Sequence, residues 1–147
     1  MKKIGFVLLV ASFAFIIAFG GSLNAYLDIP SLAFVLGIVI ALLISTGNAG
    51  NFIKSFKVLS GYAFTNQELH HCISAVELSI KGFVLSGAVG FVFGVVSMLH
   101  MLSDMSMIGP ALATAMLTMF YAAILSIFLL IINYQLKFIQ NSNVSEE

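Results

Sequence analysis

The longest uncharged stretch of the sequence most limits how the chain can fold. Between Asp104 and Lys137 there is no Asp, Glu, Lys, Arg or His, and residues 107–132 are apolar apart from hydroxyls, small side chains and one proline. At about 1.5 Å of rise per residue, a helix of this length crosses a hydrocarbon layer of about 30 Å. The stretch therefore predicts a membrane helix without ionisable groups.

The polar atoms of this helix are hydroxyls that share one face. Thr114 and Thr118 are one turn apart, Tyr121 follows three residues later, and Pro110 stands at the outer end of the same face. Two interpretations are open. The hydroxyls bond back to their own helix or join neighbouring helices, or they form a weakly polar wall that faces a pore.

Composition extends this conclusion to the whole chain. Of the 147 residues, 61% are hydrophobic and 8% are charged, so the chain could not present a soluble surface. The net charge is zero, which argues against a nucleic-acid partner. The single cysteine, Cys72, excludes an internal disulfide. We expect an all-α integral membrane protein embedded in a lipid bilayer, with one domain over residues 1–147 and no cofactor.

Four apolar runs predict four transmembrane helices. The first run follows a lysine pair and resembles a signal peptide, but it is longer than the usual core of about 7 to 15 residues, so we interpret it as a retained span. The turn at 20–30 carries Asp28 and ends in Pro30 and Ser31, which are helix-start residues. The predicted spans are about 4–20, 32–46, 82–102 and 107–136.

The segment between the second and third spans, 47–81, carries five of the twelve charged residues. Thr65 and Glu68 have the spacing of a capping box, which predicts a helix that starts near Asn66 and runs without a break into the third span. We expect the third and fourth helices to extend beyond the membrane on this side. The polar tail at 141–147 is expected to fray.

The lysines predict the topology. With four spans, both termini and the segment 47–81 lie on one side, and that side holds all six basic residues, Lys2, Lys3, Lys54, Lys57, Lys81 and Lys137. The two opposite turns hold only Asp28 and Asp104. By the positive-inside rule, both termini are predicted to be cytoplasmic.

The third span carries small residues at steps of four. Gly82, Ser86, Gly90 and Gly94 make a smooth strip along which another backbone can approach closely. The strip fits packing within one subunit at least as well as packing between subunits. His100, near the outer end, is interpreted as an interfacial residue.

Enzymatic and metal sites find little support. His70 and His71 are adjacent, so on a helix they point about 100° apart and cannot chelate one metal. Glu68 and Cys72 have a suitable spacing, but a solvated helix face is the favoured interpretation. There is no nucleophile paired with a base and no glycine-rich phosphate loop. We expect a protein that is not an enzyme.

Several motifs together resemble one family of membrane proteins. They are the turn GGS at 20–22, the spaced glycines of the third span ending in GVVSML, and the fourth-span sequence IGPALATAMLTMFYAAILS. The chain resembles the flagellar stator A subunit within the MotA/TolQ/ExbB proton-channel family, and the resemblance touches all four spans.

The resemblance implies an assembly in the bacterial inner membrane. Five copies would surround two copies of a single-span partner of the MotB/ExbD/TolR type, whose Asp binds the ion. Pro110 and Thr118 match the proline and hydroxyl positions of the family's fourth span. They would line the ion path with Thr114, Tyr121, Gly90, Phe91 and Gly94. An ion path through hydrocarbon needs an ion-binding group, and no predicted span contains a carboxylate, so the partner would supply it.

The sequence also departs from the family. About 35 residues replace the large cytoplasmic domain that contacts the flagellar rotor, so the expected load is something other than the flagellar switch. Val84 and Phe91 stand where the family has a proline and a channel threonine, and a ring of Phe91 side chains could gate the path by dewetting. Two alternatives stay open. One is a scaffold ring that holds partner helices without conducting, and the other is a small four-helix transporter.

Overall fold

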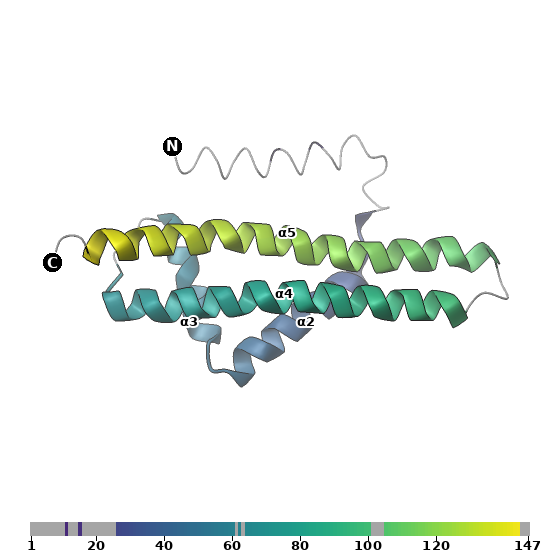
Figure 1. The fold of residues 1–147 in the computed structure, drawn as a ribbon, viewed down its shortest axis with the longest axis horizontal. Helices are drawn as coiled ribbons and strands as arrows, with labels where there is room; N and C mark the ends of the chain where they lie inside the picture. The colour runs from purple at the N-terminus through teal and green to yellow at the C-terminus, as the bar shows by residue number, and fades with distance from the viewer. Residues whose placement is uncertain are drawn as a thin grey trace.

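The chain folds into helices joined by short connections. The computed structural model describes residues 26–60, 62, 64–100 and 105–144, together with Ala11 and Phe15. In chain order the helices are α2 (Ile29–Ser45), α3 (Ala49–Ser55), the 3₁₀ helix η2 (Phe56–Ser60), α4 (Asn66–His100) and α5 (Met105–Val144) (Figure 1). The expected all-α class is confirmed for these residues, and the predicted first span, 4–20, lies outside them except at Ala11 and Phe15.

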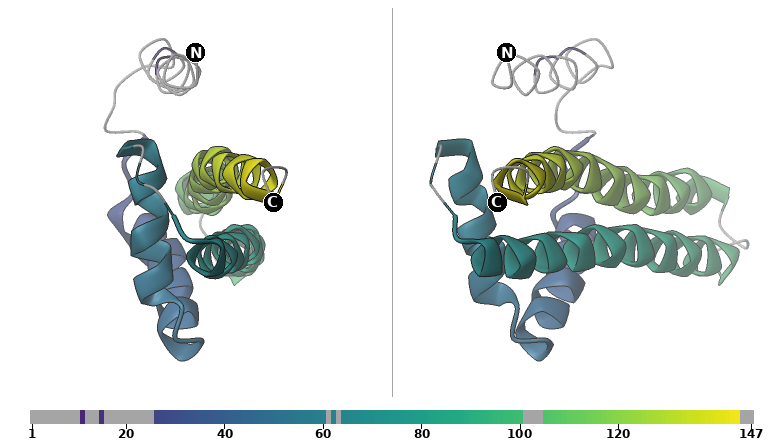
Figure 2. Two further views of the ribbon diagram at one scale, coloured as in Figure 1. Left: turned by 90° about the vertical axis from the view of Figure 1, so that its left-hand side faces the viewer. Right: turned by 60° about the vertical axis from the view of Figure 1, so that its left-hand side comes forward.

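Helices α4 and α5 form a long antiparallel pair. They lie side by side in every view (Figures 1 and 2), and both are long and apolar enough to cross a membrane. With 35 and 40 residues, they extend about 52 and 60 Å, well beyond a hydrocarbon layer of about 30 Å. The third and fourth predicted spans are therefore confirmed as membrane-length helices that continue past their apolar segments.

The end of α5 corrects one expectation. The tail at 141–147 was expected to fray, but α5 continues as far as Val144. The expectation is therefore wrong for 141–144, and residues 145–147 lie outside the described residues. The last turn lies beside the start of α4, where Asn143 Nδ2 donates a hydrogen bond of 3.0 Å to Asn66 Oδ1. This contact between α4 and α5 stabilises the helical conformation of the polar residues at the end of α5.

Small residues bring the α4 and α5 backbones close together. A Cβ atom at Gly90 would lie 2.4 Å from the Thr118 methyl group, and one at Gly94 would lie 2.5 Å from the Ala115 Cβ. A Cβ at Gly87 would lie equally close to Ala122, at 2.5 Å. These glycines of α4 therefore pack against α5 of the same chain, which was one of the two uses considered for the strip.

Helices α2, α3 and η2 form a second layer on one face of the α4–α5 pair (Figure 2). Asp28 occupies the N-cap position of α2, and Pro30 lies in its first turn, where a missing N–H costs nothing. The helix begins three residues before the expected Leu32. It ends at Ser45, and Gly47 follows the C-cap residue Thr46 with a φ of 69°, the left-handed conformation common just after a helix.

Helix α3 was not predicted. After α2 the chain turns by 114° into the helical segment 49–60, so these two pieces form a third candidate span only as a bent pair. The segment is short and contains Lys54 and Lys57, so its sequence has no apolar run long enough to predict a membrane helix. Phe52 and Leu59 nevertheless pack against the buried core, and this tertiary contact favours the helix.

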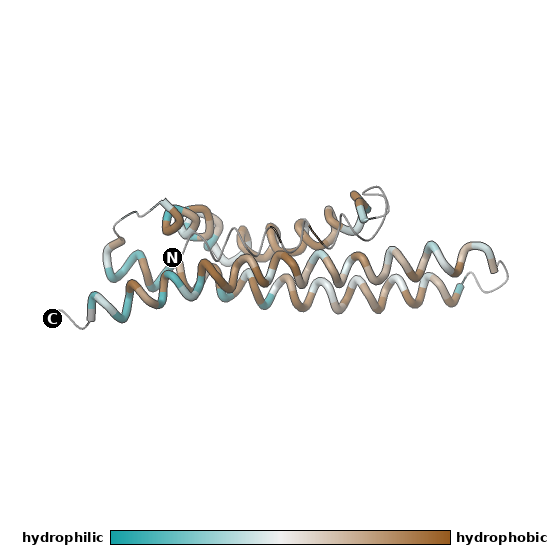
Figure 3. Tube along the Cα trace, turned by 90° about the horizontal axis from the view of Figure 1, so that it is seen from above, coloured by the Kyte–Doolittle hydropathy of each residue, from teal (hydrophilic) through white to brown (hydrophobic). Residues whose placement is uncertain are grey.

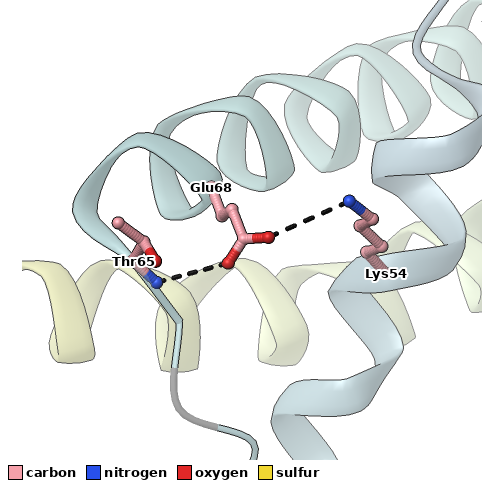
Figure 4. Close-up of polar contacts among 3 residues, drawn as sticks. All are labelled: Lys54, Thr65 and Glu68. Carbon is pink, nitrogen blue, oxygen red and sulfur yellow. Dashed lines mark hydrogen bonds and ion pairs between the residues drawn. The ribbon is translucent and has the colours of Figure 1, made fainter.

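Helix α4 begins where the capping box predicts. The Leu69 amide donates to the Thr65 carbonyl at 2.9 Å, and the Thr65 amide donates to Glu68 Oε2 at 3.4 Å. Glu68 Oε1 also lies 3.9 Å from Lys54 Nζ, so Glu68 links the start of α4 to α3 (Figure 4). The predicted start at Asn66 is confirmed.

The buried apolar core occupies one half of the α4–α5 pair. We call residues 66–83 of α4 and 122–144 of α5 the basal half, and residues 90–100 of α4 and 105–118 of α5 the distal half. Polar residues gather at the end of the basal half (Figure 3), where Lys137 Nζ lies 2.6 Å from Glu77 Oε1. The large core side chains all come from the basal half, α2 and the segment after it: Val35, Val39, Leu43, Val58, Phe64, Leu69, Ile73, Val76, Phe83, Leu129, Ile132 and Leu136.

Candidate functional site

The amino-terminal end of α2 is attached to the middle of α5. The Asp28 backbone amide donates a hydrogen bond of 2.8 Å to Tyr121 Oη, and that hydroxyl donates in turn to the Tyr26 carbonyl. Tyr121 lies sixteen residues after Met105, the first residue of α5. The start of α2 therefore lies about 24 Å along α5 from its beginning.

Two buried hydroxyls connect Asp28 to α5. Ser31 Oγ donates to Asp28 Oδ2, and Thr118 Oγ1 lies 3.1 Å from Ser31 Oγ. Ser31 and Thr118 are each only 5% exposed. We call Asp28, Ser31, Thr118 and Tyr121 the central polar cluster, because it joins a carboxylate to three hydroxyls between α2 and α5.

The cluster lies at the centre of the uncharged segments. Tyr121 stands in the middle of the uncharged run 105–136 of α5, and Gly90, which contacts Thr118, stands in the middle of the uncharged run 82–99 of α4. Asp28 was expected in a turn at the membrane surface. The structure places it beside the middle of both long helices instead, because α2 starts partway along the pair.

A cleft of about 300 Å³ leads from the distal half to this cluster. Helix α4 contributes Gly90, Gly94 and Ser97 to its lining, and α2 and α5 contribute the rest. The hydroxyls of Ser31, Thr114 and Thr118 belong to residues that line it. The full lining is Pro30, Ser31, Phe34, Gly90, Phe93, Gly94, Ser97, Ala111, Thr114, Ala115 and Thr118.

The cleft brings together four of the seven predicted path residues. Gly90, Gly94, Thr114 and Thr118 line it. Tyr121 is not a lining residue, and its hydroxyl accepts the hydrogen bond of the Asp28 amide. The other two lie elsewhere. Pro110 is exposed near the start of α5, and its carbonyl accepts a hydrogen bond of 3.1 Å from Thr114 Oγ1.

Phe91 lies outside the cleft. It lines a separate, largely apolar groove, together with Tyr26, Met116, Leu117, Met119 and Phe120. Gly90 and Phe91 are consecutive residues of a helix, so their side chains point about 100° apart. A Phe91 side chain in this position does not obstruct the cleft, and gating by Phe91 would have to occur in a different path.

Several hydroxyls of α5 bond back to their own helix. Thr118 Oγ1 lies 3.0 Å from the Thr114 carbonyl, and Ser126 Oγ lies 2.7 Å from the Ala122 carbonyl. The first interpretation of the hydroxyl face is thus confirmed for these residues. Thr118 in addition contacts α2, so its hydroxyl faces the interior of the subunit, and a pore wall between subunits stays a prediction.

The residues considered as metal ligands have separate surroundings. Cys72 is 1% exposed and packs in the core, whereas Glu68 pairs with Lys54. The interpretation as a solvated face is therefore wrong for Cys72. The rings of His70 and His71 are 6.4 Å apart, and His100 Nδ1 lies 3.0 Å from the Val96 carbonyl.

A second polar group lies in the basal half. The ion pair of Lys137 with Glu77 lowers the pKa of Glu77, chiefly through the hydrogen bond that Lys137 donates. Asn133, which is buried, donates to the same carboxylate. Its Oδ1 has no hydrogen-bond partner among the described residues, and a water molecule bound there would satisfy it.

Sequence reasoning missed Asp28 and Ser31 as site residues. Ser31, together with Pro30, predicts only a helix start, and Asp28 is expected only as a residue of the preceding turn. Their meeting with Thr118 depends on where α2 packs along α4 and α5, and no local pattern encodes that position.

Comparisons of the chain with protein-family models, with curated proteins and with solved structures each find no match.

Proposed function

We propose that the protein is an ion-path subunit of a stator-like, ion-driven assembly in a membrane. The observation that carries the proposal is the cleft between α2, α4 and α5, which is lined by the buried residues Ser31 and Thr118 beside the centre of two membrane-length helices. Ser31 in turn donates a hydrogen bond to the Asp28 carboxylate. Polar and ionisable groups at membrane depth are costly, and they commonly mark ion or substrate paths.

The apolar exterior supports an assembly of several copies within lipid. In the distal half, large side chains such as Phe93, Leu99, Met105 and Met116 are exposed on the single chain. Such a surface suits lipid or neighbouring subunits. In the proposed assembly five copies enclose two single-span partner helices, as the sequence resemblance implies, and the load is something other than the flagellar switch.

The charge distribution supports the orientation. Of the four lysines among the described residues, Lys54 and Lys137 form ion pairs with Glu68 and Glu77 in the basal half. We propose that this end faces the cytoplasm of a bacterial inner membrane, with both termini on the same side.

Thr118→Val tests the ion path. The substitution keeps the shape of the side chain and removes the hydroxyl that lies 3.1 Å from Ser31 Oγ. The protein is purified in detergent with the products of neighbouring genes, its stoichiometry is measured by native mass spectrometry, and proton and sodium flux are measured after reconstitution into liposomes. We expect unchanged stoichiometry and flux reduced to less than about one fifth of wild type, which corresponds to about 1 kcal/mol.

Ser126→Ala is the matched control. Ser126 is also buried on α5. Within the described part of the chain, its Oγ donates to the Ala122 carbonyl of the same helix and makes no hydrogen bond to α2. The control should retain flux. Equal loss of assembly in both variants would show that Thr118 only joins helices. A wild-type ring that conducts neither protons nor sodium would favour the scaffold.

A small transporter is the second candidate, and the position of Asp28 favours it. A proton-coupled transporter needs a carboxylate within the membrane, and Asp28 lies beside the centre of the long helices. If a purified monomer or dimer of this chain transports a solute without a partner protein, the small-transporter function is supported over the stator-like one.

A further inference from the structure

We propose that Asp28 is a proton-binding carboxylate of this chain, loaded and unloaded through the cleft between α2, α4 and α5. The inference rests on the proposed ion path and deepens it, because it assigns a carboxylate to this subunit itself. The sequence resemblance instead places the ion-binding group on a partner.

The position of Asp28 along the helices supports the proposal. Its backbone amide is bonded to Tyr121 Oη, and Tyr121 has about fifteen uncharged residues of α5 on either side. At about 1.5 Å per residue, more than 20 Å of uncharged α5 lies on either side of Tyr121. On α4 the uncharged run 82–99 is shorter, and Lys81 stands six residues before Gly87, which packs against Ala122. A carboxylate at such a level lies within the hydrocarbon layer, where water cannot freely solvate its charge.

Helix capping does not account for the Asp28 side chain. An N-cap aspartate usually accepts a hydrogen bond from a backbone amide of the first helical turn. Asp28 makes no such bond, and its carboxylate accepts the Ser31 hydroxyl instead. The side chain is therefore committed to the central polar cluster rather than to the backbone of α2.

The hydroxyls form a route for a proton. Thr118 Oγ1 lies 3.1 Å from Ser31 Oγ, and Ser31 Oγ donates to Asp28 Oδ2. When a hydronium ion in the cleft gives a proton to Thr118, Thr118 passes its own proton to Ser31, and Ser31 passes its own to Asp28. Both hydroxyls are restored, a water molecule remains, and the carboxylate becomes a carboxylic acid. Release is the reverse sequence.

The neighbouring elements present few titratable groups to Asp28. Tyr121 faces it from α5, and Tyr26 lies on the same segment. Helix α2, residues 82–99 of α4 and residues 105–136 of α5 contain no Lys, Arg or His. No basic side chain of these segments can neutralise the carboxylate. Within these segments, its negative charge can therefore be neutralised only by binding a proton.

Carbodiimide labelling of the wild-type protein in liposomes tests the inference. Carbodiimides react with protonated carboxyl groups, and the site of modification is read by mass spectrometry of peptides. Apolar N,N′-dicyclohexylcarbodiimide should modify Asp28 at least about tenfold faster than a water-soluble carbodiimide, because the group lies within the hydrocarbon layer.

Asp104 is the internal control, since it is the only other aspartate and follows the uncharged run of α4. It should show no preference for the apolar reagent. Asp28→Asn should abolish the apolar labelling, and Asp104→Asn should leave it unchanged. Sodium at constant pH should give no protection.

Three outcomes would overturn the inference. They are an Asp28 that stays unmodified at every pH, an Asp28 that reacts equally with both reagents, and protection by sodium, which would assign a sodium site instead. Flux separates this inference from the proposed function. Labelling without any flux would overturn the ion path alone, and flux that persists in Asp28→Asn would overturn the role of Asp28 alone.

Discussion

The basal and distal halves of the α4–α5 pair are stabilised in different ways. The basal half has a core of large side chains to which α2, the segment after it, α4 and α5 all contribute. In the described distal half only Ala115 and Thr118 are buried, and the helices meet through glycine and alanine. The first half resembles a small soluble bundle, and the second resembles the close helix contacts of membrane proteins.

The difference shows where the chain needs other molecules. Apolar burial gives the basal half its own source of stability. The distal half presents its large side chains outward, so its stability depends on lipid or on other subunits. The central polar cluster lies where the two halves meet, at the point where α2 begins.

The largest expected effect belongs to Leu69→Ala, compared with Leu99→Ala on the same helix. Leu69 is fully buried and Leu99 is 52% exposed. Removing Leu69 should lower the free energy of unfolding by about 2–5 kcal/mol because it leaves a cavity. Thermal unfolding in detergent, followed by circular dichroism, measures both variants.

Leu99→Ala should change the free energy of unfolding of the monomer by less than about 0.5 kcal/mol. If it instead weakens a detergent-stable oligomer, the distal half is a subunit interface. Similar losses from both variants in the monomer would contradict the division into two kinds of packing.

Gly94→Ala should have the next largest effect. The new Cβ would lie 2.9 Å from the Ala115 Cα and 2.5 Å from its Cβ, so the two backbones must separate. We expect a loss of about 1–3 kcal/mol in the same unfolding assay.

Gly37→Ala is the control for this substitution. It lies in α2, and an added Cβ there meets nothing within 4 Å. Because alanine favours a helix by about 1 kcal/mol over glycine, this variant should be as stable as wild type or more stable. A stabilised Gly94→Ala protein would mean that the distal seam is looser than the structure indicates.

The smallest effect concerns the ion pair of the basal half. Glu77 and Lys137 are 2.6 Å apart, with side chains 39% and 49% exposed, so solvent screens the pair and Glu77→Gln should cost less than about 1 kcal/mol. The pKa of Glu77 is lowered in the folded protein. The contribution of the Glu77 carboxylate to the free energy of unfolding is therefore complete above its unfolded-state pKa. This contribution disappears as the pH falls through the folded-state pKa.

Unfolding at neutral and acidic pH measures this contribution. Wild type and Glu77→Gln should differ at neutral pH and converge once Glu77 is protonated. Lys137→Met completes a double-mutant cycle, and a coupling of zero would show that the pair does not stabilise the basal half.

Much of the fold follows from local sequence. The uncharged runs predict α4 and α5, and the spacing of Thr65 and Glu68 predicts the start of α4. Helices α3 and η2 could not be predicted in this way, because Phe52 of α3 and Leu59 of η2 pack against the buried core. The extension of α5 to Val144 likewise depends on a contact with α4.

The candidate site was predicted only in part. The face shared by Thr114 and Thr118 follows from helical periodicity. Asp28 was placed at the membrane surface, because a hydropathy pattern gives the ends of an apolar run but not its position along a neighbouring helix. That position is fixed by packing, with Phe34 against Gly90 and with Leu42 against Gly82.

The single thiol offers a way to follow the basal half in time. Cys72 is 1% exposed in the core, and burial raises the pKa of its thiol, so a thiol reagent can modify it only after the surrounding helices open. With fast reclosing, the modification rate reports the equilibrium between closed and open forms. The wild-type chain thus carries one intrinsic reporter of local opening, placed on α4 in the buried core of the basal half.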